Sequence, residues 1–339
     1  MLSQLGSAAA GTRLYAVAGR RIALEAAEEW CGRMAATFLS NFYLDSYDGG
    51  PEATEADLTV RISADDPPPV LSGLQVFQIR QGVCRTDGET YDLDVNENRV
   101  VVLPPAARRI NVWMGRTERA RHPTARVNVM AYVLHLALRR CSLYDLHSAG
   151  VVAPATGAGV LFVGDSNSGK SSLTLRLARA GWRYMSDDFL LLHEEGEGIK
   201  VRGLRRPFSV SASSLANCEL PRLEEALGAP VNSDPSKRRL DPEVAFPGLR
   251  ADSAVPRVVF FPVITGEPDS RAEPLGQADV LTRLLRLCPW SSFDVTGRDY
   301  VQFLARLARQ VRGYALYSGR DMMADPGFAP AFVAAHANV

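Results

Sequence analysis

Eight residues near the middle of the chain, Gly164–Ser171, follow the pattern G-x-x-x-x-G-K-S. Glycines and small residues allow successive backbone N–H groups to converge on one point and bind an anion. A lysine and a hydroxyl at the last two positions suit the β- and γ-phosphates of a nucleotide and a Mg²⁺ ion. The pattern predicts a phosphate-binding loop made of Gly164, Asp165, Ser166, Asn167, Ser168, Gly169, Lys170, Ser171 and Ser172.

The residues on either side of this loop fit the same interpretation. The apolar run Gly159–Val163 is typical of a buried strand, and Lys170–Ala180 reads as a helix that Gly181 ends. A strand that runs into the loop and a helix that leaves it are the context such a loop requires, because the helix N-terminus attracts phosphate. The only lysines are Lys170, Lys200 and Lys237, so a chance match to a pattern that requires lysine is uncommon here.

Two adjacent acids, Asp187 and Asp188, lie within the apolar stretch Tyr184–Leu192, which we expect to be one strand. Charged carboxylates are costly inside an apolar strand unless they have partners. Mg²⁺ and a nucleotide phosphate supply such partners: one carboxylate can hold the metal, and the other can accept the proton of an attacking hydroxyl. The alternative is a strand end at which both acids are solvated.

A histidine and a cluster of cations are further candidates. His147 precedes the strand of the loop; it is either a structural residue or a hydrogen-bond partner that tunes the catalytic aspartate. A polar segment that we expect to be a loop carries Lys237, Arg238 and Arg239. These cations are either a solvated surface or positive charge for the phosphoryl oxygens. A second candidate cluster contains Arg202, Arg205 and Arg206.

Composition excludes several classes of protein. Acidic and basic residues number 38 each, so the zero net charge gives no electrostatic case for a nucleic-acid or membrane partner. No apolar run is long enough to span a bilayer. The 5 cysteines are scattered and form no C-x-x-C pair, which argues against a disulfide framework or a zinc site. We therefore expect a soluble, cytoplasmic protein.

At 339 residues the chain is long enough for two domains. Residues 1–122 contain several strand-like runs and one helix, which predicts a smaller α+β domain that recognises a substrate. Residues 123–339 alternate strand and helix in the way of an α/β domain, and they include all the chemical candidates. An amphipathic helix near Val127–Arg140 is expected to pack beneath this second domain.

Together, the segments LHSAGVV and GVLFVGDSNSGKSSLTLRLARAGWRYMSDDFLLL resemble the catalytic domain of HPr serine kinase/phosphorylase and its broader group of HPr-kinase-like proteins. The resemblance is strongest over 127–192 and implies a P-loop kinase fold of the HPr kinase/PEP-carboxykinase type. It implies that Lys170 and Ser171 bind the phosphates and Mg²⁺, that Asp187 is the general base with His147 beside it, and that Asp188 contacts the metal.

The resemblance also carries expectations about partners and departs from the family at one point. Members phosphorylate a serine hydroxyl of a small protein or a precursor peptide, and the HPr enzymes form closed oligomers, which makes a homo-oligomer one expectation. The HPr enzymes have an E-x-R-G-L-G signature, whereas the nearest string here begins with Lys200 and ends with Arg205. That difference argues against HPr as the substrate and against the phosphorylase reaction.

The sequence thus predicts an ATP- and Mg²⁺-dependent serine kinase that acts on a peptide or small protein. Two alternatives stay open at this point. One is a regulatory protein that binds a nucleotide without turning it over, and the other is a P-loop kinase of small molecules. Convergence of Asp187, His147 and the Lys237 cluster on one site would favour an enzyme over the regulatory alternative.

Overall fold

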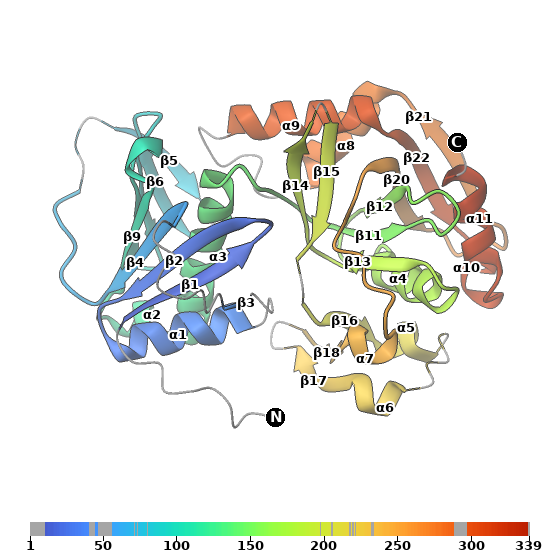
Figure 1. Cartoon of the computed structure of the whole chain (residues 1–339), viewed down its shortest axis with the longest axis horizontal. Helices are drawn as coiled ribbons and strands as arrows, with labels where there is room; N and C mark the ends of the chain where they lie inside the picture. Colours follow the sequence, from blue (N-terminus) through green and yellow to red (C-terminus); the bar gives the residue numbers. More distant parts are fainter. Residues whose placement is uncertain are drawn as a thin grey trace. The chain divides into compact units, whose positions relative to one another are not determined.

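The computed structural model describes residues 11–40, 45–46, 56–70, 72, 74–79, 81–196, 198–204, 206–216, 218, 220, 222–231, 234–287 and 297–337. The chain is a mixed α/β protein with several sheets, and its internal contacts divide it into two units, Met1–Leu143 and Tyr144–Val339 (Figure 1). Among the described residues, no helix combines the length and apolar character needed to cross a bilayer.

The first unit is built on one nine-stranded sheet with the order β3-β1-β2-β4-β9-β8-β7-β6-β5. Strand β4 pairs in parallel with β2 and β9, and the other neighbours are antiparallel. The strands are β1 (Gly11–Val17), β2 (Arg20–Ala26), β3 (Asp45–Ser46), β4 (Leu58–Ser63), β5 (Gln75–Ile79), β6 (Gly82–Thr86), β7 (Tyr91–Val95), β8 (Asn98–Val102) and β9 (Arg109–Trp113). The helices are α1 (Glu29–Leu39), α2 (Glu118–Arg121) and α3 (Pro123–Arg140), with a 3₁₀ turn at Pro105–Ala107.

Helix α3 belongs to this first unit, which differs from our expectation. Its apolar side packs on β4, β7, β8 and α1, and Val129, Met130 and Val133 are buried there. The helical spacing of its apolar residues was read correctly, but spacing does not identify the sheet on which a helix packs. The unit therefore ends at Leu143, after the helix, and not at residue 122 before it.

The second unit has a central six-stranded sheet with the order β13-β11-β12-β20-β22-β21. Its three middle strands, β12, β20 and β22, are parallel to one another, and the outer strands pair antiparallel. The strands are β11 (Ser148–Val152), β12 (Gly159–Val163), β13 (Arg183–Ser186), β20 (Pro256–Ile264), β21 (Arg271–Leu275) and β22 (Arg312–Ser318). All five residues of β12 are buried, as predicted for the strand before the loop.

Two smaller sheets complete this unit. One has the order β10-β14-β15-β19 and the other the order β16-β18-β17. Their strands are β10 (Tyr144–Leu146), β14 (Leu190–Glu195), β15 (Gly198–Gly203), β19 (Ser253–Ala254), β16 (Phe208–Ser211), β17 (Leu227–Val231) and β18 (Asp234–Leu240).

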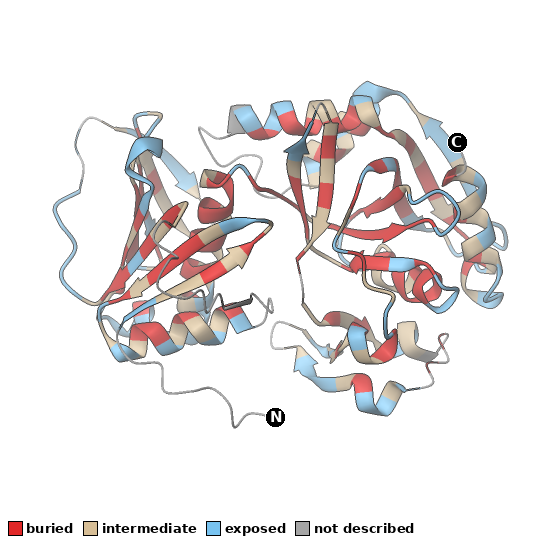
Figure 2. Cartoon of the chain, in the orientation of Figure 1, coloured by how far each residue is buried: buried red, intermediate tan, exposed pale blue. Residues whose placement is uncertain are grey.

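Helices cover the central sheet on both faces, so its inner strands β11 and β12 are fully buried, whereas the edge strand β21 is largely exposed (Figure 2). Residues of α4 and α11 pack with Phe162 and Phe260, and residues of α8 and α9 pack with Leu161 and Val259. The helices are α4 (Lys170–Arg179), α5 (Ala212–Ala216), α6 (Leu223–Ala226), α7 (Pro242–Ala245), α8 (Gln277–Leu287), α9 (Gly297–Gln310), α10 (Asp321–Ala324) and α11 (Phe328–Ala337).

The end of α4 confirms the predicted glycine cap. Gly181 has a φ of 88°, in the left-handed region that glycine tolerates. Its N–H donates to the carbonyl of Ala178 and the N–H of Trp182 donates to the carbonyl of Leu177, which is the hydrogen-bond pattern of a Schellman motif.

Two predicted elements were wrong. The stretch Tyr184–Leu192 is two strands, β13 and β14, which belong to different sheets. The cluster Lys237–Arg239 lies on strand β18 and not in a loop, because its backbone pairs with β16 and β17. Polar residues on a short, half-exposed strand leave no apolar alternation to reveal it.

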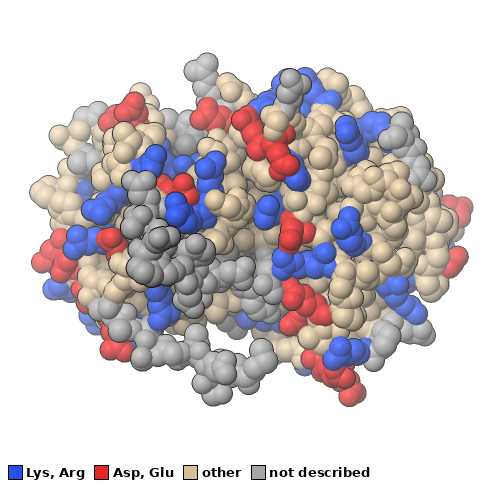
Figure 3. Space-filling view, viewed as in Figure 1, with Lys and Arg blue, Asp and Glu red and all other residues tan. Residues whose placement is uncertain are grey.

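Basic and acidic side chains are interspersed over the face of the molecule drawn in Figure 3. The mixture agrees with the equal numbers of acidic and basic residues in the sequence.

Candidate active site

The predicted loop connects β12 to α4. Asn167 and Gly169 adopt φ values of 65° and 99°, and such left-handed residues allow backbone N–H groups to converge as an anion-binding nest. A Cβ atom on Gly164 would lie 2.6 Å from Ser168 Oγ, so the loop can close this tightly only with glycine there. Ser168 Oγ is itself buried and has no hydrogen-bond partner within the part of the chain that the structure describes.

Lys170 is buried at the first position of α4. Its ammonium group donates to the carbonyl oxygens of Gly164 at 2.7 Å and Asp165 at 2.9 Å. Burial lowers the pKa of Lys170, and the nearby carboxylates of Asp188 and Asp187 oppose that effect. The side chain is thus folded back on the loop, next to the place where phosphates would bind.

Two crossovers between sheets bring the histidine and the acids together. The chain passes from β10 to β11 at His147, and from β13 to β14 at Asp187, Asp188 and Phe189. Since β10 pairs with β14 in one sheet and β11 pairs with β13 in the other, both crossovers run between the same two sheets, in opposite directions and side by side. Ser186 Oγ stabilises the break by accepting the N–H groups of Asp188 and Phe189 at 3.2 and 3.0 Å.

Asp187 faces the phosphate loop. Its Oδ2 accepts the Ser171 hydroxyl at 3.1 Å and the N–H of Ser209 at 2.9 Å. Its Oδ1 is buried and has no hydrogen-bond partner among the described residues. Burial, reinforced by the charge of Asp188, raises the pKa of Asp187 to about 6. A buried, unpaired carboxylate oxygen is costly, which is a reason to expect a cation beside it.

Asp188 is more accessible and has two basic partners. His147 Nδ1 lies 2.9 Å from Oδ1, and the Arg206 guanidinium lies 3.0 Å from Oδ2. Burial works against the charged form, but the hydrogen bond from His147 and the charge of Arg206 outweigh it and hold the pKa of Asp188 well below its usual range. Asp188 is therefore ionised at neutral pH.

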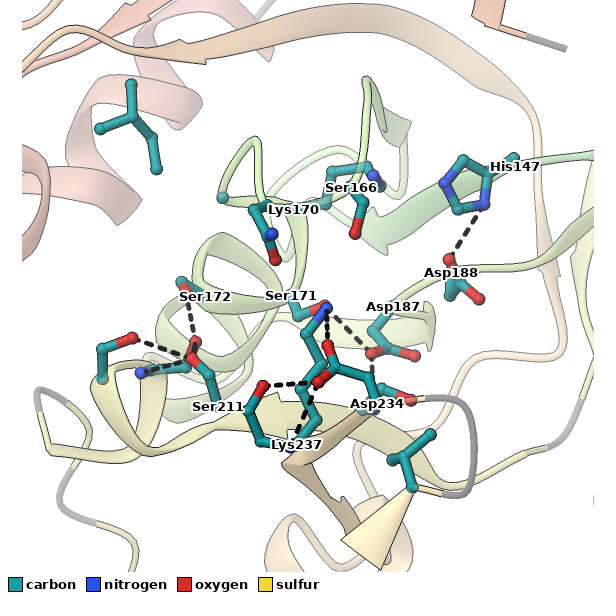
Figure 4. A pocket seen from close by; sticks show the side chains of 18 of the residues that line it. His147, Ser166, Lys170, Ser171, Ser172, Asp187, Asp188, Ser211, Asp234 and Lys237 are labelled. Carbon is teal, nitrogen blue, oxygen red and sulfur yellow. Dashed lines mark hydrogen bonds and ion pairs between the residues drawn. The ribbon is translucent and has the colours of Figure 1, made fainter. Parts of the chain in front are cut away.

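These contacts reverse the pairing expected from the sequence. His147 was expected beside Asp187, and Ser171 was expected to share a metal with Asp188; instead His147 faces Asp188, and Ser171 faces Asp187 (Figure 4). Where a strand is interrupted, the side chains of adjacent residues point in different directions. The direction of each side chain depends on neighbouring strands that the local sequence does not specify.

A pocket of about 690 Å³ joins these groups. It is lined by the loop, by the break between β13 and β14, and by the paired strands β16 and β18. The predicted residues that line it are His147, Ser166, Asn167, Gly169, Lys170, Ser171, Ser172, Asp187, Asp188 and Lys237. Gly164, Asp165 and Ser168 are not lining residues. The carbonyl oxygens of Gly164 and Asp165 accept hydrogen bonds from Lys170, and Ser168 lies close to Gly164.

Only one member of the predicted cation cluster lines the pocket. Lys237 does so, and its ammonium group lies 3.7 Å from Asp234 Oδ2. Arg238 donates to the carbonyl of Gly228 on β17 at 3.2 and 3.1 Å, and Arg239 is not a lining residue. Successive side chains of a strand alternate between its faces, so three neighbours cannot all face one site.

Arg206 is a further pocket cation beside Lys170 and Lys237, and it comes from the second candidate cluster. Of its companions, Arg202 is not a lining residue, and Arg205 lies outside the described residues. The wall opposite the loop adds Ser209, Ser211, Ser213, Ser214 and Ser236, which the sequence analysis missed. The serine-rich segment SVSASS at 209–214, which contains four of them, is the sequence feature that could have indicated this wall.

The residues present fit Mg²⁺ with a nucleotide. Mg²⁺ is usually held by one or two protein oxygens together with phosphate oxygens and waters. Ser171 Oγ and the unpaired Oδ1 of Asp187 are such oxygens, and Lys170 and the nest suit the phosphates. Among the described residues, no group of three or more His, Cys, Asp or Glu side chains forms a metal site made by protein alone.

Comparisons with known proteins add little to this geometry. No protein-family model matches the chain, and a search of curated proteins finds no match. Among solved structures, the HPr(Ser) kinase/phosphatase from Coxiella burnetii is similar over 57% of this chain and 89% of its own. The sequence identity is 15% and the TM-score is 0.30. This similarity is too distant to assign a function, which has to be argued from the site itself.

Proposed function

We propose that this protein is an ATP- and Mg²⁺-dependent kinase that transfers the γ-phosphoryl group to a serine hydroxyl of a peptide or small protein. One observation carries the proposal. An ionised, partly exposed carboxylate, that of Asp188, shares a pocket with a phosphate-binding loop and with a buried carboxylate, Asp187, that is paired to the hydroxyl of Ser171. The first carboxylate is ionised and open to the pocket, and its weak basicity suffices because the loose transition state of phosphoryl transfer depends mainly on positioning and charge. The second carboxylate suits a metal.

The loop and α4 would bind the donor. Lys170 would exchange its bonds to the carbonyls of Gly164 and Asp165 for the phosphates, and Ser171 and Asp187 would hold Mg²⁺. Bound Mg²⁺ neutralises charge on the phosphates and orients them. Arg206 and Lys237 add positive charge from the opposite wall.

Asp188 would act as the base. Its carboxylate accepts the proton of the acceptor hydroxyl as the new P–O bond forms at the γ-phosphorus and the bond from that phosphorus to the bridging oxygen breaks. The products are the phosphorylated serine and ADP. His147 and Arg206 keep the Asp188 carboxylate charged and fix its direction. Catalysis of this type depends mainly on positioning and electrostatics.

The regulatory alternative accounts for fewer features of the pocket. A nucleotide-binding module needs the loop, but it does not need a histidine, two acids and Lys237 to converge on one pocket, as they do here. A kinase of small molecules would use the same pocket. The peptide or small-protein acceptor follows from the resemblance of the sequence to HPr-kinase-like proteins.

The test is a transfer assay with γ-labelled ATP and the peptides and small proteins encoded beside the gene. The wild type is expected to label one of them on serine. Asp188→Asn should remove the label while leaving Mg-ATP binding within about twofold of the wild type, and Asp269→Asn, an exposed change of the same chemistry between β20 and β21, is the matched control. Tight ATP binding by the wild type with no labelled acceptor would favour the regulatory alternative, and full transfer by Asp188→Asn would remove the base assignment.

A further inference from the structure

Four serine hydroxyls form a connected cluster in the same pocket, apart from the acids and His147. Ser214 Oγ lies 2.8 Å from Ser172 Oγ and 2.9 Å from Ser211 Oγ, and Ser211 Oγ lies 2.9 Å from Ser213 Oγ. All four line the pocket, and we call them the hydroxyl cluster. In Figure 4, Ser172 and Ser211 lie on the opposite side of the pocket from His147 and Asp188.

The first turn of α4 separates the two ends of the pocket. Ser171 and Ser172 are adjacent, and successive residues of a helix point about 100° apart. Ser171 Oγ donates to Asp187, whereas Ser172 Oγ contacts Ser214. A triphosphate in the loop would place its γ-phosphate near Lys170 and the carboxylates. Its nucleoside end would then extend toward the hydroxyl cluster.

The chemistry of the cluster suits a sugar. Each serine hydroxyl offers one donor and two acceptor lone pairs, and it can rotate to match its partner. A row of uncharged hydroxyls can therefore pair with the vicinal 2′- and 3′-hydroxyls of ribose, which need both donors and acceptors. None of the described lining residues is Phe, Tyr or Trp, and the His147 ring lies at the other end of the pocket, so the part around the serines supplies no ring on which a base could stack.

We propose that the hydroxyl cluster is a ribose subsite, which selects ribonucleoside triphosphates through their sugar hydroxyls and discriminates little between bases. The proposal rests on the proposed function, because it requires a triphosphate in the loop. The alternative is a structural role, in which the hydroxyl contacts only fasten β16 and α5 to α4.

Calorimetry in Mg²⁺ with three probes separates these roles: ATP, 2′,3′-dideoxyATP and tripolyphosphate. The wild type is expected to bind ATP roughly 10-fold more tightly than dideoxyATP, as loss of one or two neutral hydrogen bonds implies. The double variant Ser211→Ala/Ser214→Ala should bind ATP and dideoxyATP equally and tripolyphosphate as the wild type does. Ser253→Ala, on β19, is the matched control and should keep the wild-type preference.

Three outcomes would contradict the proposal. The first is equal binding of ATP and dideoxyATP by the wild type, and the second is a preference for ATP that the double variant keeps. The third is weaker binding of all three probes to the double variant by the same factor, which would identify the structural role. If the wild type binds neither ATP nor tripolyphosphate, the proposed function fails as well, so the two failures are distinguishable.

Discussion

Replacement of Asp187 by asparagine should stabilise the ligand-free protein at alkaline pH. The Asp187 side chain is 1% exposed, and its pKa is raised from 3.8 to about 6. Because each pKa unit corresponds to about 1.4 kcal/mol, the ionised carboxylate costs the folded state about 3 kcal/mol relative to the unfolded chain. Asparagine resembles the neutral acid in shape and carries no charge, so it avoids this cost.

The sign of the pH dependence follows from the raised pKa. Between about pH 4 and pH 6 the folded state binds more protons at this site than the unfolded state, so its stability falls as the pH rises through that window and stays lower above it. Asp187→Asn should therefore exceed the wild type by about 3 kcal/mol at pH 8 and by about 1 kcal/mol at pH 4.5.

Scanning calorimetry in EDTA, without nucleotide, measures this difference. In a domain of this size, 3 kcal/mol corresponds to a rise of roughly 6–12 °C in the Tm of the second unit. Asp269→Asn, which is exposed, should leave both transitions unchanged. A difference of the same size at both pH values, or a variant less stable than the wild type at pH 8, would refute the reasoning that Asp187 is a desolvated carboxylate.

Two further predictions concern packing. Arg99 is buried and donates two hydrogen bonds of 2.8 Å to the Asp92 carboxylate. Asp92→Ala should destabilise the first unit by about 3–5 kcal/mol in urea unfolding, because it leaves the buried Arg99 charge without its carboxylate partner. A loss under 1 kcal/mol would contradict this. Gly203→Ala should cost about 1–3 kcal/mol in the same measurement, because its Cβ would lie 2.2 Å from the carbonyl oxygen of Met185; unchanged stability would show that β15 shifts freely.

The strand, the loop and the helix around Gly164–Ser171 could be predicted because they are local features. The sequence pattern Gly164–Ser171, the buried strand before it and the helix after it follow one another along the chain, and each has its own composition. The glycine cap at Gly181 is local in the same sense, since a left-handed residue is needed at one position only.

The arrangement around the acids depends on distant pairing and could not be predicted. The sequence drew attention to Asp187 and Asp188, but which of them meets His147 depends on the pairing of β10 with β14 and of β11 with β13. Lys237 enters the pocket because β18 pairs with β16, which turns Arg238 to the other face. The spacing of residues along the sequence does not specify which strands pair with each other.

The membership of α3 is a related case. The spacing of its apolar residues predicted a helix with one buried side, as the structure has it. Its place in the sequence, just before the second unit, suggested that it packs on that unit, whereas it packs on the sheet of the first unit. The ion pair of Arg206 could not be predicted for a comparable reason. Its partner Asp188 is distant along the sequence and is brought close in space at the break between β13 and β14.

Titration calorimetry of the purified protein with Mg-ATP shows whether the loop binds a nucleotide. We expect binding of one nucleotide per chain, with stabilisation of roughly 3 kcal/mol at a ligand concentration about 100 times the Kd. Lys170→Ala, which removes the buried ammonium group beside the loop, should abolish the heat without unfolding the protein. Well-folded wild-type protein that shows neither heat nor a thermal shift with Mg-ATP would contradict the account.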